Sequence, residues 1–295
     1  MKIAAVSYLN TAPLIEGLEA WDGCEMVRVV PAEIAGMVVG GAVDLGLVSV
    51  VDFAETGSGG DSMVMIPVGM IGCGGETLTV RLFSSVPIEE ISVVHGDVDS
   101  HSSVVLCDLV LRGLGVEAGF VGFDFREGVV VGGGEGGKEK IDGIPGTVLM
   151  IGDKVVVGSG WEDRYPYQID LGEAWLRMTG LPFVYAVWMC RADRVGDEEI
   201  RAGAMVLERV MLRNRMRMDW IVGRHAGRTG WPVELAERYL GELLRFEVDD
   251  LAREAVGEFL KRAADAGLVG RVEPRWMELG CCVAGDTGGS EWCLR

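Results

Sequence analysis

The segment Ser7-Tyr8-Leu9-Asn10-Thr11 places four polar side chains where the apolar run Ile3–Ser7 ends and Ala12-Pro13 begins. A buried strand followed by an early proline is typical of a chain that passes from a strand into a helix. Ligands bind beyond the carboxyl ends of parallel strands, where free amides at a helix start favour carboxylates and phosphates. The pattern therefore predicts an anion site, although Asn10 and Thr11 fit a plain helix cap equally well. The predicted ligand contacts are Ser7, Tyr8, Asn10 and Thr11.

A second polar cluster, Ser100-His101-Ser102-Ser103, lies between a predicted strand at Ile91–His95 and an apolar helix at Val104–Leu114. Three hydroxyl groups are more than the capping of one helix requires. Two such helix starts predict a ligand with two anionic groups. The ordinary pKa of histidine, near 6.5, suits His101 to acid–base work, and a solvated turn residue is the alternative.

Two weaker candidates also end predicted strands. Ser49 closes the apolar strand Asp44–Val50, and Asp153 follows the strand Val148–Ile151. Both positions lie at the sheet edge where ligands bind. We expect Ser49 to face the ligand, and Asp153 to hydrogen-bond across the hinge.

Composition excludes several classes of protein. The 295 residues carry 27 Lys and Arg against 45 Asp and Glu, a net charge of −18, which argues against nucleic acids and anionic membranes as partners. No apolar run approaches the length of a membrane span or a signal peptide, so we expect a cytoplasmic protein. Seven scattered cysteines without a Cys-x-x-Cys pair, and three histidines, predict no metal site. The loop Gly132–Gly137 lacks the Gly-Lys-Ser/Thr ending of a nucleotide site.

The positioning elements alternate in type. Strands at Ile3–Ser7, Met26–Val30 and Asp44–Val50, with the helix Pro31–Val39, predict a parallel sheet with right-handed crossovers. Helices are predicted at Glu198–Arg213, Pro232–Leu244 and Asp249–Ala266. We therefore expect an α/β protein of two lobes joined by two crossing strands, the second being Phe183–Met189. Residues 1–83 and 188–280 would form one lobe, residues 84–187 the other, and 281–295 a loose tail, with Val131–Lys138 as a loop.

Several blocks resemble chorismate dehydratases, enzymes of the futalosine route to menaquinone. The specific ones are Val6–Leu14, with its Ser-Tyr-Leu-Asn-Thr sequence, and the Thr-Gly-Leu-Pro-Phe-Val block at Thr179–Val184. The resemblance extends in order over most of residues 1–270. Supporting blocks are Val30–Glu33, Asp44–Ser49, Leu149–Asp153, Tyr165–Tyr167 and Asp170–Trp175.

The resemblance implies a type II periplasmic-binding-protein-like fold and a chorismate dehydratase that needs no metal or organic cofactor. Such enzymes eliminate water from chorismate and give 3-[(1-carboxyvinyl)oxy]benzoate. The family's substrate-contacting asparagine falls on Asn10, and its hydroxyl cluster falls on Ser100 to Ser103, so Asn10 and Ser102 are the predicted catalytic residues. The sequence Asp99-Ser100-His101, the long glycine loop and the tail depart from the pattern.

Chemistry suggests how the elimination proceeds. A neutral amide such as Asn10 has no useful basic site, so we expect the enolpyruvyl carboxylate of the substrate to take the proton, oriented by Asn10 and by Ser102 or Ser103. Two other readings stay open on the same fold. One is a non-catalytic binder or sensor of an aromatic carboxylate, and the other is the sister dihydroxynaphthoate synthase, which acts through a second-lobe histidine, here His101.

Overall fold

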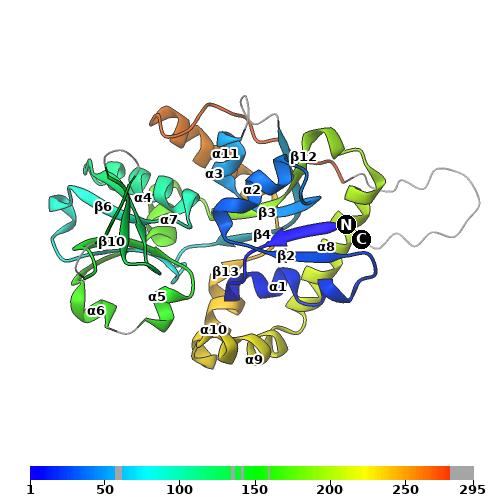
Figure 1. Cartoon of the computed structure of the whole chain (residues 1–295), viewed down its shortest axis with the longest axis horizontal. Coiled ribbons are helices and arrows are strands. Elements are labelled where there is room, and N and C mark those ends of the chain that lie inside the picture. Colours follow the sequence, from blue (N-terminus) through cyan, green and yellow to red (C-terminus); the bar gives the residue numbers. More distant parts are fainter. Residues whose placement is uncertain (57–61, 134–136, 141–142, 159, 280–295) are drawn as a thin grey trace, which may run out of the picture.

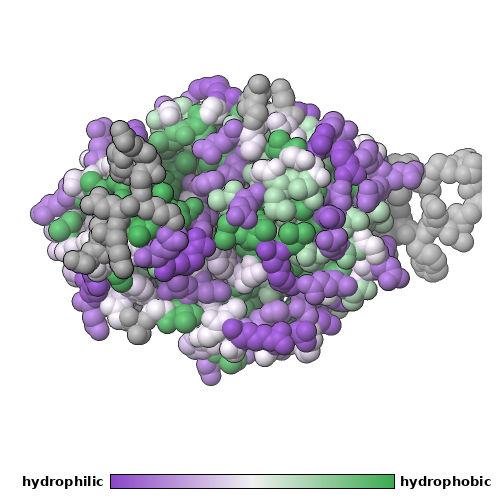
Figure 2. Space-filling view, viewed as in Figure 1, coloured by the Kyte–Doolittle hydropathy of each residue, from purple (hydrophilic) through white to green (hydrophobic). Residues whose placement is uncertain are grey.

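The computed structural model describes residues 1–56, 62–133, 137–140, 143–158 and 160–279, and the predicted tail 281–295 lies outside them. The chain forms two α/β lobes side by side, each built on its own sheet (Figure 1), which confirms the predicted architecture. The strand order is β13-β4-β12-β3-β1-β2 in the first sheet and β11-β5-β10-β6-β7-β8-β9 in the second. Hydrophilic side chains are spread over both lobes on the face shown in Figure 2, with apolar areas between them.

The first sheet begins as predicted. Strand β1 (Lys2–Ala5) pairs in parallel with β2 (Glu25–Arg28) and with β3 (Leu45–Ser49). Helix α2 (Pro31–Val39) crosses from β2 to β3 and packs on β3. Helices lie on both sides of this sheet (Figure 1), so its central strands are buried on both faces and their sequences are continuously apolar.

Two long strands and the C-terminal helices complete the first lobe. Strand β12 (Phe183–Arg191) runs antiparallel between β3 and β4 (Met63–Cys73). The predicted helices Glu198–Arg213 and Asp249–Ala266 correspond to α8 (Glu198–Arg215) and α11 (Asp250–Asp265). The prediction of one continuous helix over Pro232–Leu244 was wrong. The chain there passes from helix α10 (Val233–Arg238) through the π-turn η5 (Tyr239–Leu243) into the short strand β13 (Leu244–Arg245). The preceding helix α9 (Met218–Thr229) was not predicted.

The second sheet carries helix α4 (His101–Gly113) after strand β6 (Val93–Asp97), as the sequence indicates. Its other strands include β7 (Gly119–Asp124) and β10 (Thr147–Ile151). The predicted loop Val131–Lys138 was wrong for the residues described: β8 (Val129–Gly133) and β9 (Gly137–Lys140) pair antiparallel. Glycine-rich sequence hid this hairpin, because strand propensity is judged from side chains that glycine lacks.

The predicted boundaries between the lobes differ from the boundaries between the two sheets. Strand β5 (Val80–Ser84) pairs with β10 and β11 (Tyr167–Asp170) in the second sheet, whereas residues 80–83 were placed in the first lobe. Residues 183–187, placed in the second lobe, belong to β12 of the first sheet. The first change of lobe falls in the connection between β4 and β5, and the second falls between β11 and β12, a connection that includes a helix at Leu171–Thr179. An apolar strand sequence does not show which of two sheets the strand joins.

Asp170 secures one of these connections. It ends β11 and caps α7 (Leu171–Thr179) by accepting the amide of Glu173 at 3.1 Å. The same carboxylate accepts the amides of Thr77 at 3.0 Å and Leu78 at 2.8 Å, in the connection between β4 and β5. Leu78 has φ of +61°, a left-handed conformation that costs energy in a non-glycine residue. The Asp170 carboxylate therefore holds a strained segment where the chain changes lobe.

We predict that Asp170→Ala lowers the free energy of unfolding by about 2–4 kcal/mol, because it removes the acceptor of three backbone amides at once. Asp249→Ala is the matched control, since Asp249 caps α11 by accepting the single amide of Ala252 at 2.8 Å and should cost about 1 kcal/mol. Urea unfolding followed by circular dichroism measures both. Equal losses in the two variants would show that the connection contributes nothing beyond the cap.

Candidate functional site

One cavity between the lobes collects most of the predicted site residues. It encloses about 740 Å³ of space between atoms, part of it open to solvent. The first lobe contributes Tyr8, Asn10 and Ser49, and the second contributes all four residues from Ser100 to Ser103. Apolar side chains form much of the remaining wall, namely Val6, Leu47, Ile71, Val80, Ile151 and Leu244. A cavity of this kind suits an organic molecule with an apolar body and a few polar groups.

Ser102 of the second lobe forms hydrogen bonds to the first lobe. Its side-chain oxygen lies 2.6 Å from that of Ser49, accepts the amide of Val51 at 3.3 Å, and donates to the carbonyl of Tyr185 at 3.3 Å. Ser49, Val51 and Tyr185 all belong to the first lobe, whereas Ser102 lies in the first turn of α4. The buried hydroxyl thus has a complete set of partners across the cleft.

The helix start in the second lobe matches its prediction. Ser100 is the N-cap of α4, and its hydroxyl accepts the amide of Ser103 at 3.3 Å. The helix is 13 residues long, and its first-turn residues line the cavity. Its positive end therefore faces the enclosed space, where it favours a negatively charged group.

The first-lobe helix starts at Ala12 as predicted, but it is shorter than an anion site at a helix start requires. Helix α1 (Ala12–Ile15) has a single turn, preceded by the 3-10 turn η1 (Leu9–Thr11), so no extended helix dipole points at the cavity. Thr11 is completely buried, and its hydroxyl donates to the carbonyls of Val6 at 3.0 Å and Tyr8 at 2.6 Å, so it stabilises the turn and does not line the cavity. Ser7 is exposed and lines a neighbouring pocket, because side chains alternate in direction as the strand ends.

Asn10 lines the cavity as predicted, together with Tyr8 and Ser49 of the first lobe. Its carbonyl oxygen is buried and has no hydrogen-bond partner within the described part of the chain. Tyr239, which was not predicted, lines the same cavity, and its hydroxyl lies 2.7 Å from that of Thr79. An unpaired buried acceptor is costly, so the Asn10 oxygen is poised to receive a donor from a bound molecule.

Asp153 bonds across the lobes, as expected. Its carboxylate accepts the amide of Leu9 at 3.3 Å and the indole N–H of Trp231 at 3.0 Å, both in the first lobe. Burial raises the pKa of Asp153 above its usual range. Next to it, Gly152 has φ of +72° and lies against the ring of Tyr8, where a Cβ would come within 3.5 Å. Asp153 lines the neighbouring pocket with Ser7, so it holds the lobes together beside the cavity.

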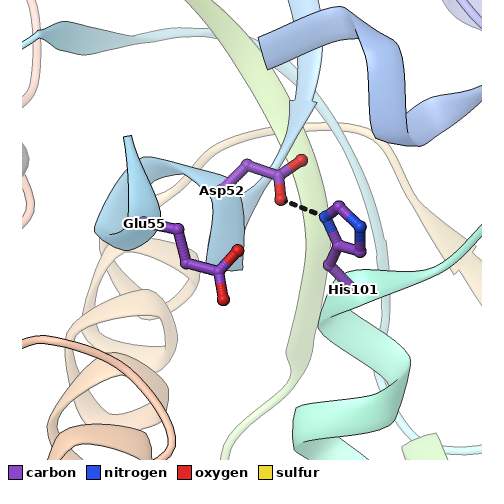
Figure 3. A group of neighbouring side chains, drawn as sticks. All are labelled: Asp52, Glu55 and His101. Carbon is purple, nitrogen blue, oxygen red and sulfur yellow. Dashed lines mark hydrogen bonds and ion pairs between the residues drawn. The ribbon is translucent and has the colours of Figure 1, made fainter. Parts of the chain in front are cut away.

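Asp52 is a cavity residue that sequence analysis missed. It lies in the short helix α3 (Val50–Glu55), and its carboxylate accepts a hydrogen bond from Nδ1 of His101 at 2.5 Å. Figure 3 shows this pair, with the carboxylate of Glu55 beside it and no bond drawn to Glu55. A signal was present, because a charged residue inside the apolar run Val50–Ala54 needs a partner if the run is buried.

The three side chains Asp52, Glu55 and His101 have ligand atoms within 4.8 Å of one another, a spacing that prompts the question of a metal ion. Two ligands bound to one ion at about 2.0–2.2 Å lie roughly 3 Å apart or more. Nδ1 and Oδ1 at 2.5 Å are closer than that, and their spacing is that of a short hydrogen bond. The geometry is therefore that of a histidine–carboxylate pair.

Comparison with known proteins identifies the family. The family described as menaquinone biosynthesis matches residues 1–265. The chain belongs to this family. A chorismate dehydratase from Thermus thermophilus is 28% identical over 200 residues, which cover 63% of this chain and 68% of that relative. The resemblance stated from the sequence is thereby confirmed at the level of the family.

Solved structures show the fold of this menaquinone biosynthesis protein. A Candida albicans protein with the generic periplasmic-binding-protein fold aligns with a TM-score of 0.63 at 14% identity, covering 97% of this chain and 98% of that one. The alkanesulfonate-binding protein from Xanthomonas axonopodis aligns with a TM-score of 0.57 at 10% identity, covering 92% and 94%. The predicted periplasmic-binding-protein-like fold is confirmed. Among the described residues, the helices are too short or too polar to cross a bilayer.

We predict that Asp153→Ala frees the amide of Leu9 and speeds its hydrogen exchange roughly 10-fold, because the amide loses its acceptor in the other lobe. Asp44→Ala is the control: Asp44 also accepts a backbone amide, that of Lys2 at 2.6 Å, but within the first lobe. Mass spectrometry of peptides covering residues 6–14 reports the exchange. An unchanged rate at Leu9 in Asp153→Ala would contradict the bond across the lobes.

Proposed function

We propose that this protein is a chorismate dehydratase that eliminates water from chorismate and releases 3-[(1-carboxyvinyl)oxy]benzoate. The observation that carries the proposal is that Asn10 and Ser102, from opposite lobes, line one cavity. Membership of the menaquinone biosynthesis family and the similarity to a chorismate dehydratase support it. In this reading the protein is a hydro-lyase, and Asn10 and Ser102 are the catalytic residues.

The cavity suits the chemical groups of chorismate. The hydroxyls of Ser100 and Ser103 and the free amides at the start of α4 can donate to one carboxylate of the substrate, whereas the Ser102 hydroxyl already donates to the carbonyl of Tyr185. The unpartnered oxygen of Asn10 can accept from its hydroxyl group, and the apolar wall can cover its ring. No lysine or arginine of the described chain lines this cavity, so recognition of the dianion rests on neutral donors, the helix start and His101.

The elimination removes the proton at C3 and the hydroxyl group at C4. The electrons of the C3–H bond form a ring double bond, the C4–O bond breaks, and the departing hydroxide takes up a proton to leave as water. Aromatisation of the ring drives the step. The enolpyruvyl carboxylate of the substrate takes the C3 proton, which then passes to the departing hydroxide. Asn10 and the start of α4, which carries Ser102, hold this carboxylate in place, and such positioning can remove about 7–11 kcal/mol from a barrier.

The protein carboxylates at the cavity support this assignment of the base. Asp52 is engaged by His101 at 2.5 Å, and Asp99 is engaged by Arg126 at 3.1 Å. Each of these carboxylates is thus oriented toward a side chain of the protein and not toward a bound molecule. The carboxylate carried by the substrate reaches the cavity without such a partner, and it is already attached to the ring that loses the proton.

Incubating the purified protein with chorismate should yield the aromatic product, which is detected by its ultraviolet absorbance and mass. A protein that binds chorismate in calorimetry without converting it would be a binder or sensor, which contradicts the enzyme assignment. Conversion of a naphthoate precursor instead, with loss of that activity in His101→Gln, would point to the dihydroxynaphthoate synthase. Either result would overturn the proposal.

We predict that Asn10→Asp abolishes turnover of chorismate, because a second carboxylate beside the substrate carboxylate repels it and disrupts its orientation. Ser7→Ala is the control and should leave the rate within about twofold, since Ser7 is exposed and lies outside the cavity. Initial rates at saturating chorismate provide the measurement. A faster Asn10→Asp enzyme would mean that a protein base is preferable to the substrate carboxylate.

A further inference from the structure

The pair formed by Asp52 and His101 joins the two lobes directly. Asp52 belongs to α3 of the first lobe, and His101 is the first residue of α4 in the second lobe. Their side chains meet with Oδ1 and Nδ1 2.5 Å apart (Figure 3). The contact is made from opposite sides of the cleft, so it exists only while the cleft is closed.

In both lobes the residues of the Asp52–His101 pair lie close in sequence to those of the Ser49–Ser102 contact. His101 precedes Ser102 in α4, and Asp52 follows the segment Ser49–Val51 that bonds to Ser102. Two adjacent residues of the second lobe therefore contact one short segment of the first. Fixing His101 fixes the first turn of α4, and the Ser102 hydroxyl is carried on that turn.

Asp52 needs a hydrogen-bonded partner because its carboxylate is buried. The Asp52 side chain is 4% exposed, whereas that of His101 is 41% exposed. A buried carboxylate without a hydrogen-bonded partner is strongly unfavourable. The second oxygen of Asp52 has no hydrogen-bond partner in the described chain, so His101 is the side chain that compensates the carboxylate.

We propose that Asp52 and His101 form an inter-lobe latch, a pair of positioning residues that stabilises the closed cavity and holds Ser102 against the first lobe. The latch stabilises the closed state by holding Ser102 against the first lobe. Neither Asp52 nor His101 needs to exchange a proton with the substrate. Because it concerns the closing of the lobes, the latch can operate whether the bound molecule is converted or only retained.

The charges around His101 favour its protonated form when the latch is closed. The hydrogen bond to Asp52 is the main cause that raises the pKa of His101, and the charges of Asp52 and Glu55 add to it against the effect of burial. Asp97 of β6 and Asp108 of α4 line the pocket on the other side of His101, but they are paired with Lys154 and Arg112, and the segment after α11 contributes the apolar Leu268. No cation is among the described residues that line this pocket.

The sign of the pH effect follows from this shift. In the open state His101 titrates near its ordinary pKa of about 6.5. Closure raises that pKa, so the latch contributes fully below pH about 6.5 and weakens as the pH rises through the higher pKa of the closed state. Ligand affinity should therefore fall with rising pH, in a range where the carboxylates of chorismate stay ionised.

The test compares Asp52→Asn with a matched control. Another histidine–carboxylate pair, His225 and Glu16 at 2.8 Å, lies wholly within the first lobe, so His225→Gln breaks a similar contact without touching the cleft. We expect Asp52→Asn to weaken chorismate affinity roughly 5- to 10-fold at pH 6 and to leave kcat within twofold, with His225→Gln unchanged in both. The double variant Asp52→Asn/His101→Gln should bind no more weakly than His101→Gln alone, because either substitution removes the same contact.

Binding is measured by calorimetry between pH 6 and pH 9. Wild type should lose affinity over this range, while Asp52→Asn should show a flat profile. A variant with wild-type affinity and wild-type pH dependence would overturn the latch, and so would a variant that loses kcat with unchanged affinity.

A second readout does not depend on the proposed reaction. Without ligand, amides in residues 101–106 should exchange hydrogen faster in Asp52→Asn than in wild type or His225→Gln at pH 6, after correction for intrinsic rates. If chorismate is neither bound nor converted but this exchange changes as expected, the proposed function fails and the latch stands. Unchanged exchange would remove the latch whatever the ligand is.

Discussion

A hydrogen bond of 2.6 Å between the hydroxyls of Ser49 and Ser102 joins two lobes that the described part of the chain connects twice. Both lobes line the cavity, so neither lobe folded alone would present the site. The closed arrangement is held on one side by Ser102 and His101, and on another by Asp153 with its two first-lobe donors. The site is therefore a property of closure, and the affinity for a ligand includes the free energy of bringing the lobes together.

Electrostatics explains how a protein with a net charge of −18 could bind the proposed dianion. The distant acidic residues are screened by salt within about 10 Å, whereas the donors at the start of α4 act at contact distance. The nearby carboxylates Asp52, Asp97 and Asp99 each have a cationic or histidine partner, namely His101, Lys154 and Arg126. This pairing keeps their charge from opposing an anion in the cavity.

Much of this could be predicted from the sequence, and the failures have physical causes. The apolar strands, the helix after Ser100, and the placement of Asn10 after the first strand and of Ser102 at a helix start follow from local pattern. Thr11 has the residue type of a ligand contact, but burial and two backbone acceptors assign it to the turn. Asp52 and Tyr239 reach the cavity only through tertiary packing, which a single sequence shows at most indirectly, as with a charge inside an apolar run. The glycine hairpin β8–β9 left no side-chain pattern to detect.

The central claim is that one ligand is held between Asn10 and Ser102 in the closed cavity. A crystal structure with the aromatic product, 3-[(1-carboxyvinyl)oxy]benzoate, tests it most directly. The account predicts that the ring lies in the cavity, with a carboxylate at the start of α4 and a polar group within hydrogen-bond distance of the Asn10 side chain. Product bound outside this cavity, or touching residues of one lobe only, would contradict the account.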